Sequence, residues 1–148
     1  MKPELQLSLH FADPGPRAEL PRHRVARWMR AALAVPAQIA VRVVGEDEGR
    51  ALNREWRGQD HATNVLTFDY EHAPVVVADL VLCAPVVSRE AAQQRRPLDA
   101  HYAHLLVHGV LHAQGWDHQR AAAARRMEAE ESRILLALGF ADPWSAPR

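Results

Sequence analysis

The chain is organised around residues 108–118, which read His-Gly-Val-Leu-His-Ala-Gln-Gly-Trp-Asp-His. On a helix, His108 and His112 would lie about 40° apart around the axis and about one turn apart along it, so both can reach one metal ion. Gly115 follows, and glycine readily takes the left-handed conformation that ends a helix. The chain then turns back and brings His118 in from another direction. The spacing therefore predicts three nitrogen ligands around one metal ion.

Three neutral imidazoles at about 2.0–2.1 Å suit zinc, and three protein ligands leave a fourth tetrahedral position open for water. That arrangement is more typical of a catalytic site than of a structural one. The alternative is a histidine-rich helix face that binds no metal. Four histidines share one stripe of this helix: His101, His104, His108 and His112. The additional histidine after the helix-ending glycine favours one Zn²⁺ per chain.

The spacing H-x-x-x-H-x-x-G-x-x-H is also that of the metzincin peptidases. In those enzymes a catalytic glutamate follows the first histidine, whereas this chain has Gly109 at that position. A zinc metallopeptidase would share the metal ligands but would lack its general base here. That class is therefore kept only as an alternative.

The segment from His104 to His118 resembles the signature of the YbeY family of bacterial endoribonucleases, H-G-x-L-H-x-x-G-x-D-H. Every fixed position of that pattern is present in residues 108–118. The run from Met127 to Phe140 also resembles the family, as do two segments nearer the N-terminus. Together these segments cover most of the chain in the order that the family shows.

The first of the two upstream segments, residues 53–68, departs from the family's motif at three positions. It has His61-Ala62 where a basic residue and proline are common, and Thr67 where serine is usual. The second, residues 78–82, resembles the family's strand motif G-D-[IL]-V-I, with Ala78 in place of glycine.

The resemblance implies a zinc-dependent, single-strand-specific endoribonuclease. Such an enzyme acts in ribosomal RNA maturation, including the 3′ end of small-subunit rRNA, and in ribosome quality control. Its partners would be single-stranded rRNA, the ribosome and ribosome-associated proteins, with no membrane involved. A non-catalytic ribosome assembly factor with a structural metal remains an alternative, because a metal that only stabilises the fold would need the same ligands.

The resemblance also implies that His108, His112 and His118 bind the metal and that Arg57 takes part in catalysis. The family carries an arginine at the position of Arg57 that is considered important for ribonuclease activity. By spacing alone, a cation in the last turn of a helix would be read as complementing the helix dipole.

Five more residues are candidates for supporting the site or binding the substrate: Asp117, Asp60, Asn64, Asp79 and His104. Asp117 could orient a ligand imidazole, and it could equally cap the turn. Asp60 could hold Arg57 in place, and Asn64 could shape the same loop.

The other two candidates are expected to act less directly. Asp79 interrupts an apolar strand, so its carboxylate must be paired or face a cleft. His104 lies one turn before His108, at a position where the family often has a histidine that is not one of its three ligands. Structural support is therefore the expected role of His104.

Composition limits the remaining possibilities. With 148 residues, a single domain is expected, with residues 1–140 as the metal-dependent endoribonuclease domain and residues 141–148 as a loosely ordered tail. A formal net charge of zero argues against a general nucleic-acid coating protein, so RNA contacts should come from a local patch. No apolar run approaches the roughly 20 residues that span a bilayer, and the single cysteine cannot form an internal disulfide. We expect a soluble, cytoplasmic protein.

Periodicity and turn residues divide the chain into alternating elements. Strands are predicted at 4–10, 38–44, 64–70 and 75–83. Helices are predicted from 21 onward, up to 57 after an acidic turn at 45–49, and at 85–94, 98–114 and 121–138. This order predicts an α/β or α+β domain with one small mixed sheet covered by helices. The resemblance implies a four-stranded sheet, with the metal helix placed as in zinc metalloproteases.

Overall fold

The computed structural model of the protein describes residues 3–145. Its strands are β1 (Leu5–Phe11), β2 (Ala37–Val44), β3 (Val65–Glu71) and β4 (Val76–Cys83). Its helices are α1 (Arg22–Ala31), α2 (Glu46–Arg57), α3 (Ala84–Gln93), α4 (Leu98–Ala113) and α5 (Ala121–Ala137), with a short 3-10 helix at Arg17–Glu19. Among these residues, no helix is both long and apolar enough to cross a membrane.

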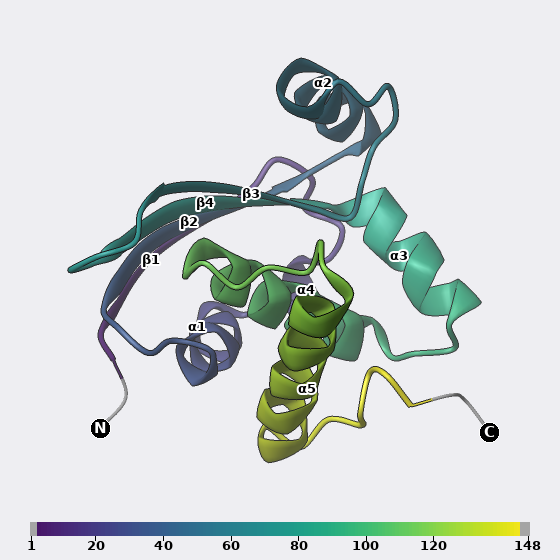
Figure 1. The fold of residues 1–148 in the computed structure, drawn as a ribbon. Coiled ribbons are helices and arrows are strands. Elements are labelled where there is room, and N and C mark those ends of the chain that lie inside the picture. The colour runs from purple at the N-terminus through teal and green to yellow at the C-terminus, as the bar shows by residue number, and fades with distance from the viewer. Residues whose placement is uncertain (1–2, 146–148) are drawn as a thin grey trace.

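The four strands form one mixed sheet in the order β1-β2-β4-β3. β1 and β4 each run parallel to β2, whereas β3 runs antiparallel to β4. Helices α1 and α4 lie on one face of the sheet, and α5 lies against α4 (Figure 1). Helix α2 lies over the opposite face. The predicted mixed four-stranded sheet covered by helices is therefore confirmed.

The predicted strands and helices are confirmed to within about a residue at their ends, with one exception. Residues 45–49, predicted as an acidic turn before a helix, already belong to α2 from residue 46 onward. The amide of Gly49 donates to the carbonyl of Gly45 at 3.0 Å, which closes the first helical turn. The acidic side chains therefore lie inside the first turn, where the positive end of the helix dipole favours them.

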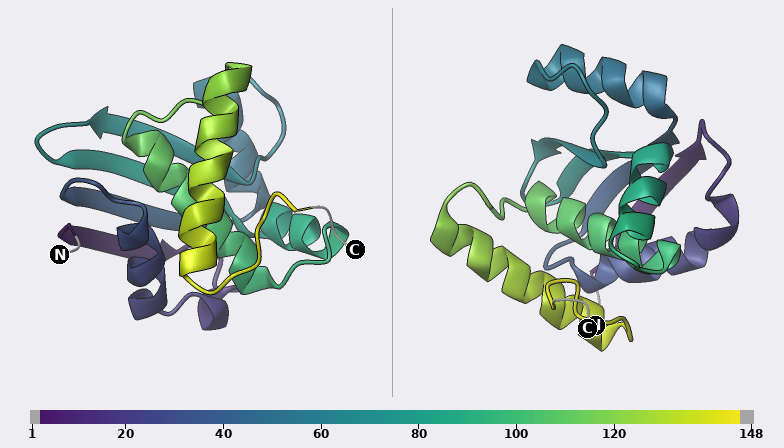
Figure 2. Two further views of the ribbon diagram at one scale, coloured as in Figure 1. Left: turned by 60° about the horizontal axis from the view of Figure 1, so that its bottom comes forward. Right: turned by 90° about the vertical axis from the view of Figure 1, so that its right-hand side faces the viewer.

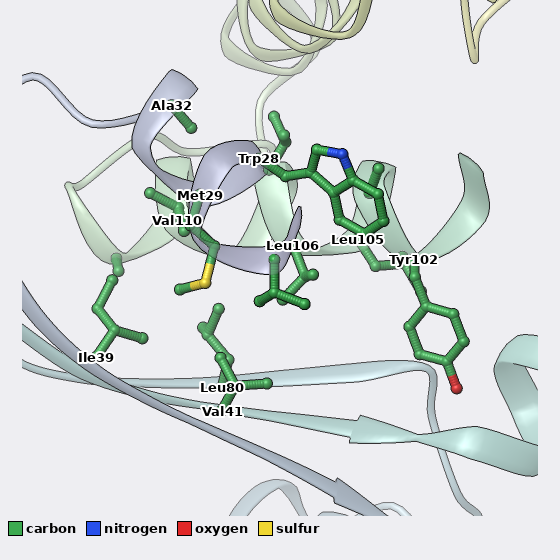
Figure 3. Close-up of a cluster of buried hydrophobic side chains, with 14 of the residues drawn as sticks. Trp28, Met29, Ala32, Ile39, Val41, Leu80, Tyr102, Leu105, Leu106 and Val110 are labelled. Atoms are coloured by element: carbon green, nitrogen blue, oxygen red, sulfur yellow. The ribbon is translucent and has the colours of Figure 1, made fainter. Parts of the chain in front are cut away.

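Helix α4 is the central element of the larger core, since most of its side chains are buried and it contacts α1, α3, α5 and the sheet. Side chains from α1, α4 and the sheet meet there (Figure 3): Trp28, Met29, Val41, Leu80, Leu106 and Val110. The strands alternate, so Leu80 faces this core while Val81 and Cys83 belong to a smaller cluster on the other face.

Helix α4 approaches the sheet closely at Gly109. A Cβ atom at this position would lie 3.0 Å from both methyl carbons of Leu80, a distance at which Leu80 would have to shift. Leu80 is fully buried, so it has little room to do so. Position 109 thus points into the core.

We expect Gly109→Glu to destabilise the protein by about 3–5 kcal/mol, because it overpacks the core and buries a carboxylate without a partner. Urea unfolding, followed by circular dichroism, measures the change. Ala121→Glu is the matched control, since Ala121 is exposed in the first turn of α5, where an acid is tolerated. An unfolding midpoint equal to that of the parent would contradict the assigned packing.

Candidate functional site

The three histidines of the 108–118 segment come together at the end of α4. His108 and His112 project from its last two turns, and Gly115, with φ of 99°, ends the helix in the left-handed conformation. The amide of Trp116 then donates to the carbonyl of Leu111 at 3.2 Å, which turns the chain back. The ring centre of His118 lies 5.3 Å from that of His108 and 5.2 Å from that of His112.

These separations fit a shared metal ion. The ring centres of His108 and His112 are 6.0 Å apart. Imidazoles bound to one tetrahedral zinc at about 2.1 Å have ring centres roughly 5 Å apart, close to all three values. Within residues 3–145, however, no three His, Cys, Asp or Glu side chains are already arranged to hold a metal ion. The rings would therefore have to turn their ring nitrogens toward one point to bind it.

Hydrogen bonds identify the nitrogens that remain available on two of the rings. Nδ1 of His112 lies 2.9 Å from the carbonyl oxygen of Trp116, which can only accept, so this nitrogen carries the proton. Nδ1 of His108 lies 2.7 Å from a carboxylate oxygen of Glu131 and donates in the same way. We therefore assign to both rings the tautomer whose Nε2 has a lone pair, the form that binds zinc.

His118 is held in the loop after α4 and is more exposed than the other two rings. Partial burial, together with the neighbouring His108 and His112, lowers the pKa of His118. A lower pKa favours the neutral imidazole at neutral pH, and only the neutral form can bind a metal ion. The chemistry of all three donors thus suits zinc.

Glu131 of α5 is the site residue that sequence reasoning missed. It is 1% exposed, and its carboxylate accepts hydrogen bonds from His104 Nε2 at 2.6 Å, His108 Nδ1 at 2.7 Å and Trp144 Nε1 at 3.2 Å. Burial by itself raises the pKa of Glu131, but the hydrogen bonds from His104 and His108 outweigh it and lower the pKa to about 2. The carboxylate is therefore ionised and orients His108.

A sequence signal for Glu131 did exist. It occupies one position of the otherwise apolar buried stripe of α5, whose members are Met127, Glu131, Ile134 and Leu135. An acid on a buried stripe requires a partner. The sequence did not identify that partner, because His104 and His108 precede Glu131 by 27 and 23 residues.

Three of the five supporting candidates lie at or beside the imidazole cluster. His104 is joined to His108 through the shared Glu131 carboxylate. Asp117 accepts a hydrogen bond from the amide of Gln119 at 2.9 Å, so it caps the turn that carries His118. Asn64 lines the same pocket as His108.

No contact within the described residues, 3–145, brings the other candidates to the cluster. Arg57 is exposed in the last turn of α2. The expected pairing of Asp60 with Arg57 is wrong, because Asp60 bonds Arg50 at 2.9 and 3.0 Å and lies 3.8 Å from Arg54. Arg50, which lies on α2, donates to both carboxylate oxygens of Asp60.

Asp79 lies on the opposite face of the sheet from α4, since its neighbour Leu80 faces the α4 core. The hydroxyl of Tyr70 donates to Asp79 at 2.8 Å. Asp79 is therefore hydrogen-bonded, which was one of the two alternatives expected for it. The sheet separates it from the imidazoles.

The start of the tail contributes to the site. Asp142 accepts hydrogen bonds from the Ser132 hydroxyl at 2.7 Å and the Trp144 amide at 2.9 Å. The Trp144 ring packs edge-on against His104, with 5.3 Å between ring centres. Of the tail predicted to be loosely ordered, residues 141–145 make these contacts, and residues 146–148 lie outside the described part of the chain.

The peptidase alternative is weakened by the packing of α4. In a zinc peptidase the glutamate after the first histidine acts as general base on the water bound to the metal. Here position 109 points at Leu80 in the core, with a Cβ atom only 3.0 Å from its methyl carbons. A side chain at this position would first have to displace Leu80.

Comparison with known proteins agrees with the geometry. The family model described as Endoribonuclease YbeY matches residues 17–139. An Endoribonuclease YbeY from Methylibium petroleiphilum is 67% identical over 144 residues, covering 97% of each chain. Another from an Acidovorax species is 63% identical over 148 residues, with the same coverage. The solution structure of TM1509 from Thermotoga maritima shares the fold, with a TM-score of 0.60 and 20% identity over 95% of this chain and 99% of that one.

Proposed function

Because this chain belongs to the YbeY family of endoribonucleases, we propose that it cleaves single-stranded RNA with one Zn²⁺ held by His108, His112 and His118. Family membership supports an endoribonuclease that acts in rRNA processing. The proposal adds the zinc, the single-strand preference and the individual roles of the residues.

The main support for the zinc assignment is the hydrogen bonding of His108 and His112, the two imidazoles on α4. His108 and His112 each donate through Nδ1, to Glu131 and to the carbonyl of Trp116. These hydrogen bonds favour, in both rings, the tautomer whose Nε2 can bind a metal ion. When bound, zinc would polarise a phosphoryl oxygen and make water acidic enough to act near neutral pH. Such chemistry needs no glutamate at position 109.

Arg57 would meet the negative charge that develops on the phosphate. Its guanidinium is exposed, and among residues 3–145 it has no hydrogen-bond or ion-pair partner. A substrate phosphate would therefore not have to displace a carboxylate first. Since the net charge of the chain is zero, phosphate recognition depends on such local cations.

The biological setting of the proposal follows from the family. We include rRNA maturation with processing of the small-subunit 3′ end, ribosome quality control, a cytoplasmic location, and contacts with the ribosome and ribosome-associated proteins. We propose unpaired RNA as the substrate, because a protein can stack on and hydrogen-bond to each splayed base individually.

The deciding experiment offers equal molar amounts of a single-stranded RNA, its duplex and casein to the zinc-loaded protein. We expect cleavage of the single strand, because side chains cannot enter the narrow major groove of an A-form duplex. Casein cleavage without RNA cleavage would favour the metallopeptidase. Cleavage of neither, with full zinc content, would favour the non-catalytic assembly factor.

Arg57→Lys tests whether the guanidinium binds phosphate. Lysine keeps the charge near the helix end but cannot form the two-pronged contact, so we expect the barrier to cleavage to rise by about 2–4 kcal/mol, roughly 30- to 1,000-fold in rate. Single-turnover cleavage measures this, with zinc content and melting temperature taken on the same samples.

Arg54→Lys is the matched control, because Arg54 is exposed on the same helix and lies 3.8 Å from Asp60. We expect it to cleave as the parent does. Parental cleavage by Arg57→Ala would refute the catalytic role, and a collapsed melting temperature would show that Arg57 stabilises the fold instead.

A further inference from the structure

A pocket of about 650 Å³ opens directly beside His108. It lies between the turn that joins α3 to α4, the buried face of α4, and residues 141–145. Figure 2 shows this last segment returning from the end of α5 toward α3 and α4. The volume is within the range of about 300–1,000 Å³ that is usual for ligand sites.

The carboxylates that line the pocket are already satisfied. Glu90 accepts hydrogen bonds from Asn64 Nδ2 at 3.0 Å and from His101 Nε2 at 2.9 Å. Asp142 accepts from Ser132 and from the amide of Trp144. Among residues 3–145, neither acid forms an ion pair with an arginine of the pocket.

Two arginines of the same wall have no acidic partner among residues 3–145. Arg96 contacts Gln94 Oε1 at 3.2 Å and the Nδ1 atoms of His101 and His104 at 3.4 Å, all of them neutral acceptors. No carboxylate of residues 3–145 lies within ion-pairing distance of Arg95 or Arg96. A phosphate that enters the pocket could therefore reach these two guanidinium groups without first displacing a carboxylate from them.

Arg95 is also held in a backbone conformation that does not suit it. Its φ is 55°, and it is the only residue other than glycine with a positive φ between residues 3 and 145. The residue follows the end of α3, at a position where glycine or asparagine is adopted more easily. The conformation belongs to the turn that ends α3, in which the amide of Arg96 donates to the carbonyl of Ala91 at 2.9 Å, so glycine would fit position 95 without strain.

Trp144 forms an aromatic wall of the pocket. Its indole is fixed by the hydrogen bond to Glu131 and by the edge-on contact with His104, yet it remains 50% exposed. A fixed, half-exposed aromatic ring beside unpaired arginines is the combination that single-stranded nucleic acid binds, with a base stacked on the ring and phosphate on the cations.

We propose that this pocket binds one unpaired nucleotide of the RNA substrate, with its base against Trp144 and its phosphate at Arg95 and Arg96. The inference rests on the proposed endoribonuclease function and names a binding site for that substrate. Because His108 lines the same pocket, a nucleotide seated there directs the adjoining phosphodiester to the imidazole cluster. A base held in a duplex cannot enter, so the pocket also selects single strands.

Arg95→Gly gives the sharpest test, because it relieves the backbone strain while it removes the cation. We expect its affinity for a short fluorescein-labelled single-stranded RNA to fall about 3- to 10-fold, while its melting temperature stays the same or rises. Trp144→Ala should weaken binding about 5- to 100-fold, whereas Trp144→Phe should retain most of it. Fluorescence anisotropy measures binding, and single-turnover cleavage is followed on the same preparations.

Arg133→Ala is the control, since Arg133 is exposed on α5 and paired with Glu130 at 2.6 Å. It should bind RNA as the parent does. Parental affinity in both Arg95→Gly and Trp144→Ala, with normal cleavage, would overturn the pocket assignment and leave the endoribonuclease function intact. A parent protein that neither binds nor cleaves the single strand would overturn the proposed function and the pocket with it.

Discussion

Replacing His112 with alanine is expected to reduce bound zinc from about one ion per chain to almost none and to abolish RNA cleavage. Two imidazoles hold zinc far less tightly than three, and the lost ligand is one whose orientation the Trp116 carbonyl maintains. Metal analysis of the purified proteins and single-turnover cleavage are the direct measurements.

The same substitution should remove the stabilisation that zinc provides. An ion that binds only the folded chain adds about 4 kcal/mol at a thousandfold excess over its dissociation constant. The parent should therefore melt higher when zinc is added, and His112→Ala should not. Without zinc, the two proteins should melt at similar temperatures, because His112 lies only half-buried at the end of α4.

His23→Ala is the control for removing a histidine, since His23 is exposed on α1. It should keep parental zinc content, melting temperature and cleavage. Equal zinc content in His112→Ala and the parent would disprove the three-histidine assignment.

Removing the carboxylate of Glu131 is the second substitution with a large expected effect. Glu131→Ala leaves the donors of His104, His108 and Trp144 without this acceptor, the first of them buried, and we expect a loss of about 3–5 kcal/mol of folding stability. Urea unfolding in the absence of added metal measures this loss. A loss below about 1 kcal/mol would mean that water replaces the carboxylate without penalty.

Glu131→Gln separates orientation of the metal ligand from stability. Glutamine is nearly isosteric, but its amide nitrogen donates, so it cannot accept from both His104 Nε2 and His108 Nδ1. One imidazole must change tautomer or turn away. We expect zinc affinity to fall about 10- to 100-fold, as for other residues that orient a metal-binding histidine.

Competition with a chromophoric chelator measures that affinity, and Glu130→Gln is the matched control. Glu130 is the preceding residue and pairs with Arg133 at 2.6 Å, away from the histidines. It should bind zinc as the parent does. Parental zinc affinity in Glu131→Gln would show that His108 does not depend on this hydrogen bond.

Features that depend on neighbours in the chain could be predicted from the sequence. The periodic apolar residues determined the strands and helices, because each period places one face of an element against the core. The convergence of His108, His112 and His118 was also local, because it needs only one helical turn and the left-handed Gly115. The order of the elements predicted a small mixed sheet covered by helices. The family resemblance implied that this sheet has four strands.

Features that depend on distant parts of the chain were decided only by the tertiary structure. Glu131 reaches His108 because α5 packs on α4, and nothing in the spacing of these residues indicates that contact. Asp60 had cations at 50, 54 and 57 within reach, and the geometry of the loop selected Arg50. The pocket at Arg95, Arg96 and Trp144 exists because residues 141–145 return to α4. Local sequence determines which elements form and which way each side chain points, whereas the packing of those elements determines which side chains meet.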